Sequence, residues 1–111
     1  MMDIKVAIKQ NTQVVTIAGE IDGSSAPQAQ EVILAQVSEG SKVVLDMTGV
    51  TYMSSAGLRM LLLAYRTVNS RGGKIVLVGL SSDLKDTMSV TGFLDFFTCV
   101  DTLDAGLAAL A

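Results

Sequence analysis

The chain has 111 residues, half of them hydrophobic, and 8 basic against 11 acidic side chains give a formal net charge of −3. This length and hydrophobic content are typical of one folded domain with its own core, so we expect a single domain over residues 1–111. The charge balance and the lack of any basic run argue against nucleic acid or an anionic membrane surface as a partner.

Two residue types are scarce, and their scarcity excludes several kinds of chemistry. The chain has no histidine and a single cysteine, Cys99, which removes Ser-His and Cys-His catalysis and the usual transition-metal ligands. We therefore expect no metal, no cofactor and no enzymatic activity. One cysteine forms no internal disulfide, and Cys99 is interpreted as a buried apolar residue. Neither a signal peptide nor a membrane span of ~20 apolar residues is found, which favours a cytoplasmic protein.

Hydrophobic periodicity predicts an α/β fold. Alternation over residues 2–10 and 13–21 predicts two strands joined as a hairpin. Apolar runs at 42–46 and 74–78 predict buried strands, and a short strand is expected near 98–100. Helical spacing predicts four helices between and after these strands, so we expect a mixed β-sheet with an N-terminal hairpin and about four helices.

Helix starts are predicted from polar residues at capping positions. Ser25 and Gln28 have the spacing of a capping box, and the helix that follows should end at Gly40. Ser82 and Asp101 are expected to cap the last two helices.

The segment that follows the strand at 43–45 is the most informative part of the chain. A polar loop there is expected to deliver Ser54 and Ser55 to the first turn of a helix. Only one serine can be the N-cap, so the other is either redundant or a hydroxyl placed where a helix start favours an anion. Gly57 follows in the first turn, where glycine costs ~1 kcal/mol against alanine. We interpret Gly57 as clearing space around the hydroxyl for another surface.

Ser55 lacks the neighbours that a nucleophile needs, because no histidine exists and Arg59 lies one turn further on. It is better interpreted as a substrate. Phosphorylation would add roughly −1.5 to −2 charges, which a helix start tolerates and an apolar or acidic docking surface opposes. The Ser-x-x-Lys spacing of Ser82 and Lys85 is interpreted as a capped helix with a solvated lysine.

Acidic residues and a methionine lie near the serines in sequence. Glu20 and Asp22 are either solvated loop acids or an acidic rim near Ser55, if the two loops share one end of the sheet. Asp46 is expected to bind loop amides and shape the serine loop. Met53 is interpreted as a soft contact for a partner.

The segments Gly19–Asp22, Val44–Val50, Tyr52–Arg59 and Gly72–Val78 resemble the anti-sigma factor antagonists, bacterial single-domain members of the STAS group. The resemblance implies a protein that binds an anti-sigma factor serine kinase and so frees a sigma factor. The kinase then phosphorylates and releases the antagonist, and a metal-dependent serine phosphatase restores it.

The resemblance also implies roles for residues. The phosphoacceptor of the family corresponds to Ser55, and Asp22 and Asp46 match acids of the partner-facing surface. Ser54 stands where many members have an acidic residue, and Ala56 where many have serine, so Ser54 is a secondary candidate for phosphorylation. The expected partner-binding set is Asp22, Met53, Ser54, Ser55, Gly57 and Arg59. Two alternatives remain: a constitutive subunit of a transport ATPase or stressosome-type complex, and a small-ligand-binding module.

Overall fold

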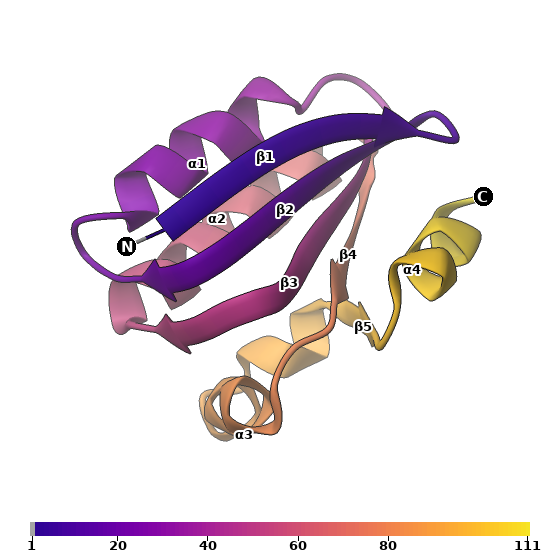
Figure 1. The fold of residues 1–111 in the computed structure, drawn as a ribbon. Helices are drawn as coiled ribbons and strands as arrows, with labels where there is room; N and C mark the ends of the chain where they lie inside the picture. The colour runs from indigo at the N-terminus through magenta and orange to yellow at the C-terminus, as the bar shows by residue number, and fades with distance from the viewer. Residues whose placement is uncertain (1) are drawn as a thin grey trace.

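The computed structural model describes residues 2–111, which form a five-stranded mixed sheet with four α-helices and one short 3₁₀ helix (Figure 1). The element order confirms the predicted α/β class. In chain order the elements are β1 (Met2–Lys9), β2 (Thr12–Ile21), α1 (Ala26–Ala35), β3 (Lys42–Met53), α2 (Ser55–Ser70), β4 (Lys74–Val78), α3 (Ser82–Val90), η1 (Phe93–Phe96), β5 (Thr98–Val100) and α4 (Leu103–Leu110). No helix within residues 2–111 is long and apolar enough to cross a bilayer.

The predicted hairpin is confirmed, because β1 and β2 pair antiparallel up to Lys9 and Thr12. The turn residues Gln10 and Asn11 have φ angles of 51° and 62°. Two successive left-handed residues make the turn type that matches the twist of a hairpin. The apolar face of β1 is only partly buried. Ile4 packs against the core, whereas Val6 and Ile8 are 40% and 69% exposed because the core ends short of them.

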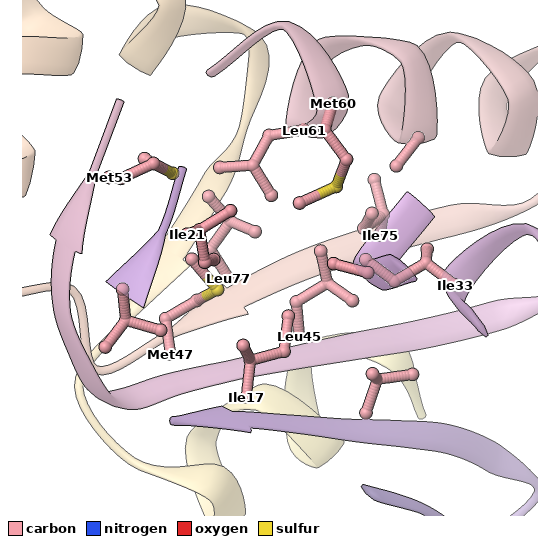
Figure 2. Packing of buried hydrophobic residues seen from close by; sticks show 14 of the residues in the cluster. Ile17, Ile21, Ile33, Leu45, Met47, Met53, Met60, Leu61, Ile75 and Leu77 are labelled. Carbon is pink, nitrogen blue, oxygen red and sulfur yellow. The ribbon is translucent and has the colours of Figure 1, made fainter. Parts of the chain in front are cut away.

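The strands lie in the order β1-β2-β3-β4-β5, and all pairs except the hairpin are parallel. The larger core lies between the sheet and helices α1 and α2 (Figure 2). Its fully buried side chains include Ile17, Ile33, Leu45, Met47, Leu61 and Leu77. A smaller core on the other face packs α4 against β3 and β4 through Leu107 and Leu110. Both faces of the central strands are therefore covered, as their continuous apolar runs predict.

The strand predicted over residues 42–46 is longer than expected, because β3 continues to Met53. The polar loop predicted before the serines is therefore wrong. The register between β2 and β3 shifts twice along this extension, which is the sign of a β-bulge. Gly49 permits the first shift, since a Cβ there would lie 2.9 Å from Cβ of Ala18. The dipeptide Thr48-Gly49 resembles a turn in sequence, yet β3 continues through it and stays hydrogen-bonded to β2.

Two predicted helix caps are wrong by one residue. Ser81, and not Ser82, caps α3 by accepting a 3.2 Å hydrogen bond from the Leu84 amide. Thr102, and not Asp101, caps α4 by accepting from the Ala105 amide at 3.1 Å. In both places two neighbouring residues are competent caps, and the packing of the helix selects one.

Candidate functional site

The carboxyl ends of β2 and β3 lie side by side and bring two predicted segments together. Ile21 at the end of β2 is paired with Met53 at the end of β3. The next amide, that of Ser54, donates to the Ile21 carbonyl at 2.8 Å. Asp22 and Ser54 thus each follow directly on one of two adjacent strands. The segments that carry Asp22 and the serines therefore share one end of the sheet, which was the condition for an acidic rim near the serines.

The two serines have different environments. Ser54 is the half-buried N-cap of α2, and its Oγ accepts a long, 3.4 Å hydrogen bond from the Gly57 amide. Ser55 is the first residue of α2 and is exposed. Within residues 2–111 its hydroxyl forms no hydrogen bond. Ser54 is therefore engaged in starting the helix, whereas the Ser55 hydroxyl is available to react.

Gly57 and Met53 face the core beneath the serines. A Cβ on Gly57 would lie 2.5 Å from Cγ of Met53 and 3.2 Å from the Ile21 carbonyl oxygen. Met53 is 7% exposed, and Figure 2 shows it together with Ile21 at one end of the core. The interpretation of Gly57 as space for a partner, and of Met53 as a partner contact, is corrected here. The surface that approaches Gly57 belongs to the same chain, and both residues form the floor of the site.

Asp22 is held as a carboxylate by the turn that it begins. Its Oδ1 accepts from the Ser24 hydroxyl at 2.7 Å, the Ser24 amide at 2.9 Å and the Ser25 amide at 3.1 Å. These donors lower the pKa of Asp22 below its ordinary value, the Ser24 hydroxyl most of all. Its Oδ2 accepts no hydrogen bond within the described residues. Oδ1 of Asp22 thus shapes the turn, whereas Oδ2 has no hydrogen-bond partner within residues 2–111.

Ser25 belongs to the same turn, and the predicted capping box with Gln28 is absent at this helix start. The Ser25 hydroxyl donates to the Glu20 carbonyl at 2.8 Å and accepts from the Asp22 amide at 2.9 Å. These bonds tie the end of β2 to the start of α1. The position of Asp22 beside the serines is therefore set by hydrogen bonds from several directions.

We expect the Asp22 carboxyl to have a pKa below its ordinary value, and Ser24→Ala to raise this pKa because the strongest donor is lost. A carboxylate with a depressed pKa stabilises the fold above its unfolded-state pKa, and this contribution is lost as the pH falls through the folded-state pKa. NMR titration of the Asp22 side-chain carboxyl carbon measures its pKa in the parent and in Ser24→Ala. Ser89→Ala, at an exposed serine of α3, is the control. An unchanged Asp22 pKa in Ser24→Ala would contradict the assignment.

Arg59 lies one turn after Ser55 on α2 and is exposed. Residues four apart on a helix share a face. Among the described residues the only ion pair joins Lys85 and Asp101, at 3.6 Å. The Arg59 guanidinium is therefore free to meet an anion at Ser55.

Asp46 does not shape the serine segment, which corrects its predicted role. Its Oδ1 accepts from the Thr48 hydroxyl at 2.7 Å and from the Thr48 amide at 3.1 Å. The rest of β3 separates it from Ser54 by up to about 26 Å at the rise of an extended strand. Asp46 does bind a backbone amide, as expected, but the bond supports the bulged part of β3. The pairing of this part of β3, which was missed in the sequence, explains the difference.

A shallow groove between α1 and α2 begins beside the serines and was missed by the sequence analysis. It has a volume of about 760 Å³, and Pro27, Glu31, Leu34, Ala56, Arg59 and Leu63 are among its lining residues. Leu63 is 39% exposed. The available signal was the apolar character of Leu34 and Leu63, which lie outside the core-facing stripes of their helices.

Comparison with known proteins identifies the family. Residues 3–106 match the STAS domain family. The anti-sigma-B factor antagonist of Listeria monocytogenes is 36% identical over 98 residues, which cover 85% of this chain and 86% of that protein. An anti-sigma factor antagonist from Mycobacterium paratuberculosis, known from a crystal structure, has a TM-score of 0.89 at 27% identity and covers 99% of this chain and 94% of its own.

A further solved structure shares the fold at lower identity. The Bacillus cell fate determinant SpoIIAA, in its phosphorylated form, has a TM-score of 0.76 at 16% identity and covers 98% of this chain and 100% of its own. The family match and the 36% identical relative confirm the resemblance to the anti-sigma factor antagonists, and the chain belongs to the STAS domain family as a relative of these proteins.

Proposed function

We propose that this protein is an anti-sigma factor antagonist controlled by phosphorylation of Ser55. In this proposal it binds an anti-sigma factor that is also a serine kinase, and binding frees a sigma factor. The observation that carries the proposal is the exposed, unbonded hydroxyl of Ser55 on the first residue of α2, next to the carboxylate turn of Asp22. The similarity to anti-sigma factor antagonists and the existence of a phosphorylated form of SpoIIAA support it.

The surface around Ser55 offers two kinds of contact to such a partner. The free Oδ2 of Asp22 suits a cationic side chain, because charge-assisted hydrogen bonds are about twice as strong as neutral ones. The groove between α1 and α2 suits an apolar side chain against Leu34 and Leu63. Ser55 directly precedes Ala56, which lines the groove, and follows Ser54, whose amide bonds the residue before Asp22, so a charge added at Ser55 adjoins both features.

The phosphoryl transfer needs little from this chain beyond an accessible hydroxyl. The Ser55 Oγ attacks the γ-phosphorus of ATP held by the kinase, an O–P bond forms, and the bond to ADP breaks. The hydroxyl proton passes to a base of the kinase, since this chain has no histidine. The phosphatase reverses the modification by transferring the phosphoryl group to water.

The fold tolerates the new charge even though the partner does not. A phosphoserine carries roughly −1.5 to −2 charges at neutral pH. The free amides at the start of α2 and the Arg59 guanidinium one turn away both favour a negative charge. The cationic side chain that pairs with Asp22 is already engaged, so a docked partner has to remove the second negative group from water without a counter-charge for it. The modification therefore opposes binding without unfolding the antagonist.

Incubation with its anti-sigma factor kinase and ATP is expected to place one phosphate on Ser55, located by mass spectrometry of the intact chain and its peptides. Ser55→Ala should abolish the label because the attacking hydroxyl is gone. Ser54→Ala is the matched control and should keep it, since only the N-cap is changed. Label persisting in Ser55→Ala would overturn the site. If the protein is instead a constitutive subunit of a larger complex, the parent chain should remain unlabelled and the Ser55→Ala variant should function normally.

A further inference from the structure

The outer edge of β1 is unpaired within residues 2–111. β1 is the first strand in the sheet order and pairs with β2, and Figure 1 shows it at the margin of the sheet, in front of α1. A two-residue turn joins Lys9 to Thr12, so the ladder begins with a hydrogen-bonded pair there. Pairs alternate along an antiparallel ladder, and the even-numbered residues of β1 therefore direct their N–H and C=O groups outward. An exposed edge of this kind is a template for another strand.

The side chains of β1 make this edge suitable for a particular strand. Ile4, Val6 and Ile8 share one face, and Val6 and Ile8 are 40% and 69% exposed. The opposite face carries Asp3 near one end of the strand and Lys9 at the other. A strand that complements this pattern needs apolar residues on one face. On its other face it needs a positive charge opposite Asp3 and a negative charge opposite Lys9.

We propose that β1 pairs antiparallel with β1 of a second copy of this chain, with the two-fold axis at Val6. In this register Val6 lies opposite Val6 of the second copy, and Ile4 opposite Ile8, so the apolar face continues across the interface. Asp3 lies opposite Lys9 at both ends of the ladder. Val6 then forms a hydrogen-bonded pair, which agrees with the outward direction of its backbone groups. The five-stranded sheet becomes a ten-stranded one across the two copies.

The charges of β1 disfavour the neighbouring registers. Moving the axis to Lys5 places two lysines opposite each other, and moving it to Ala7 places Lys5 opposite Lys9. Like charges directly opposite are destabilising. An axis between two residues sets the apolar face of one copy against the charged face of the other. The register centred on Val6 avoids both faults over the whole strand.

The proposed interface leaves the candidate phosphorylation site accessible. Ser55 follows β3, and β2 lies between β3 and the paired edge. The inference therefore stands or falls independently of the proposed function.

Charge exchange tests the register in solution. Sedimentation of the full chain from about 10 μM to about 1 mM should show a monomer–dimer equilibrium, as expected for a small interface. Asp3→Lys and Lys9→Asp should each weaken dimerisation by about tenfold, because both end pairs become repulsive. The double variant, Asp3→Lys with Lys9→Asp, should recover to within about threefold of the parent by the same reasoning. Asp95→Lys, at an exposed site on η1, is the charge control and should not change the equilibrium.

A parent chain that stays monomeric at about 1 mM, or a double variant that dimerises no better than the single variants, would overturn the proposal. Cross-linking gives a second measurement. In a Cys99→Ser background, Val6→Cys should form a disulfide-linked dimer with diamide as oxidant, since the Cα atoms of a hydrogen-bonded pair lie about 5.5 Å apart. Thr16→Cys, exposed on β2 but away from the edge, is the control. Equal cross-linking of both variants would also overturn it.

Discussion

Replacing Gly57 by alanine is expected to lower the free energy of unfolding by about 2 kcal/mol. The added Cβ would lie 2.5 Å from Cγ of Met53 and 3.0 Å from Cγ2 of Ile21, so the floor beneath the serines must move. Overpacking of this kind typically costs 1–3 kcal/mol, whereas the helix propensity of alanine returns at most about 1 kcal/mol. Urea denaturation measures the change as a lower midpoint with an unchanged slope.

Two further variants isolate the cause of this loss. Gly23→Ala is the matched control, because no atom lies within 4 Å of its added Cβ, and it should change stability little. Met53→Ala removes the nearest neighbour, so Gly57→Ala should cost less in that background than in the parent. If Gly57→Ala is as stable as Gly23→Ala, the space between Gly57 and the side chains of Met53 and Ile21 is not tight.

The second large effect concerns binding, and it rests on the proposed function. Ser55→Asp is expected to weaken binding to the anti-sigma factor kinase at least about tenfold, or about 1.4 kcal/mol, measured by calorimetry. The aspartate introduces a charge that the interface must desolvate next to Asp22. Stoichiometrically phosphorylated protein, with roughly −1.5 to −2 charges, should bind more weakly still.

Ser55→Asn separates charge from size, since asparagine has nearly the shape of aspartate without its charge, and it should bind close to the parent. Ser70→Asp places the same charge at the opposite end of α2 and should leave affinity unchanged. Parent-like affinity of Ser55→Asp would contradict a switch based on charge.

Much of the fold could be predicted because the decisive signals are local. The apolar runs of β3 and β4 indicate strands covered on both faces, and the short link between two alternating segments indicates a hairpin, although its turn lies at residues 10–11 and not between the predicted strands 2–10 and 13–21. The extension of β3 to Met53 could not be predicted, because Thr48 and Gly49 are kept in a strand only by bulged pairing with β2. Pairing between distant segments leaves little trace in a short window of sequence.

The candidate site was predicted less completely, for a related reason. The position of Ser55 at a helix start follows from the sequence pattern, whereas Asp22 was placed near Ser55 only on the condition that the two loops share one end of the sheet. Which way Met53 and Gly57 face depends on the geometry of the strand-to-helix junction, and here both face inward. The groove needs α1 and α2 packed together before its walls exist.

The hydrogen bond between the Ser54 amide and the Ile21 carbonyl, with the tight packing of Gly57 below it, has a consequence for the speed of any signal. The start of α2 is fastened to the sheet, so the proposed modification of Ser55 requires no lid to open and no segment to refold. The time course of modification should then depend on encounter with the modifying enzymes and on their turnover rather than on slow motions of this chain. Amide exchange at Ser54 should accordingly be slow in both the free and the phosphorylated protein.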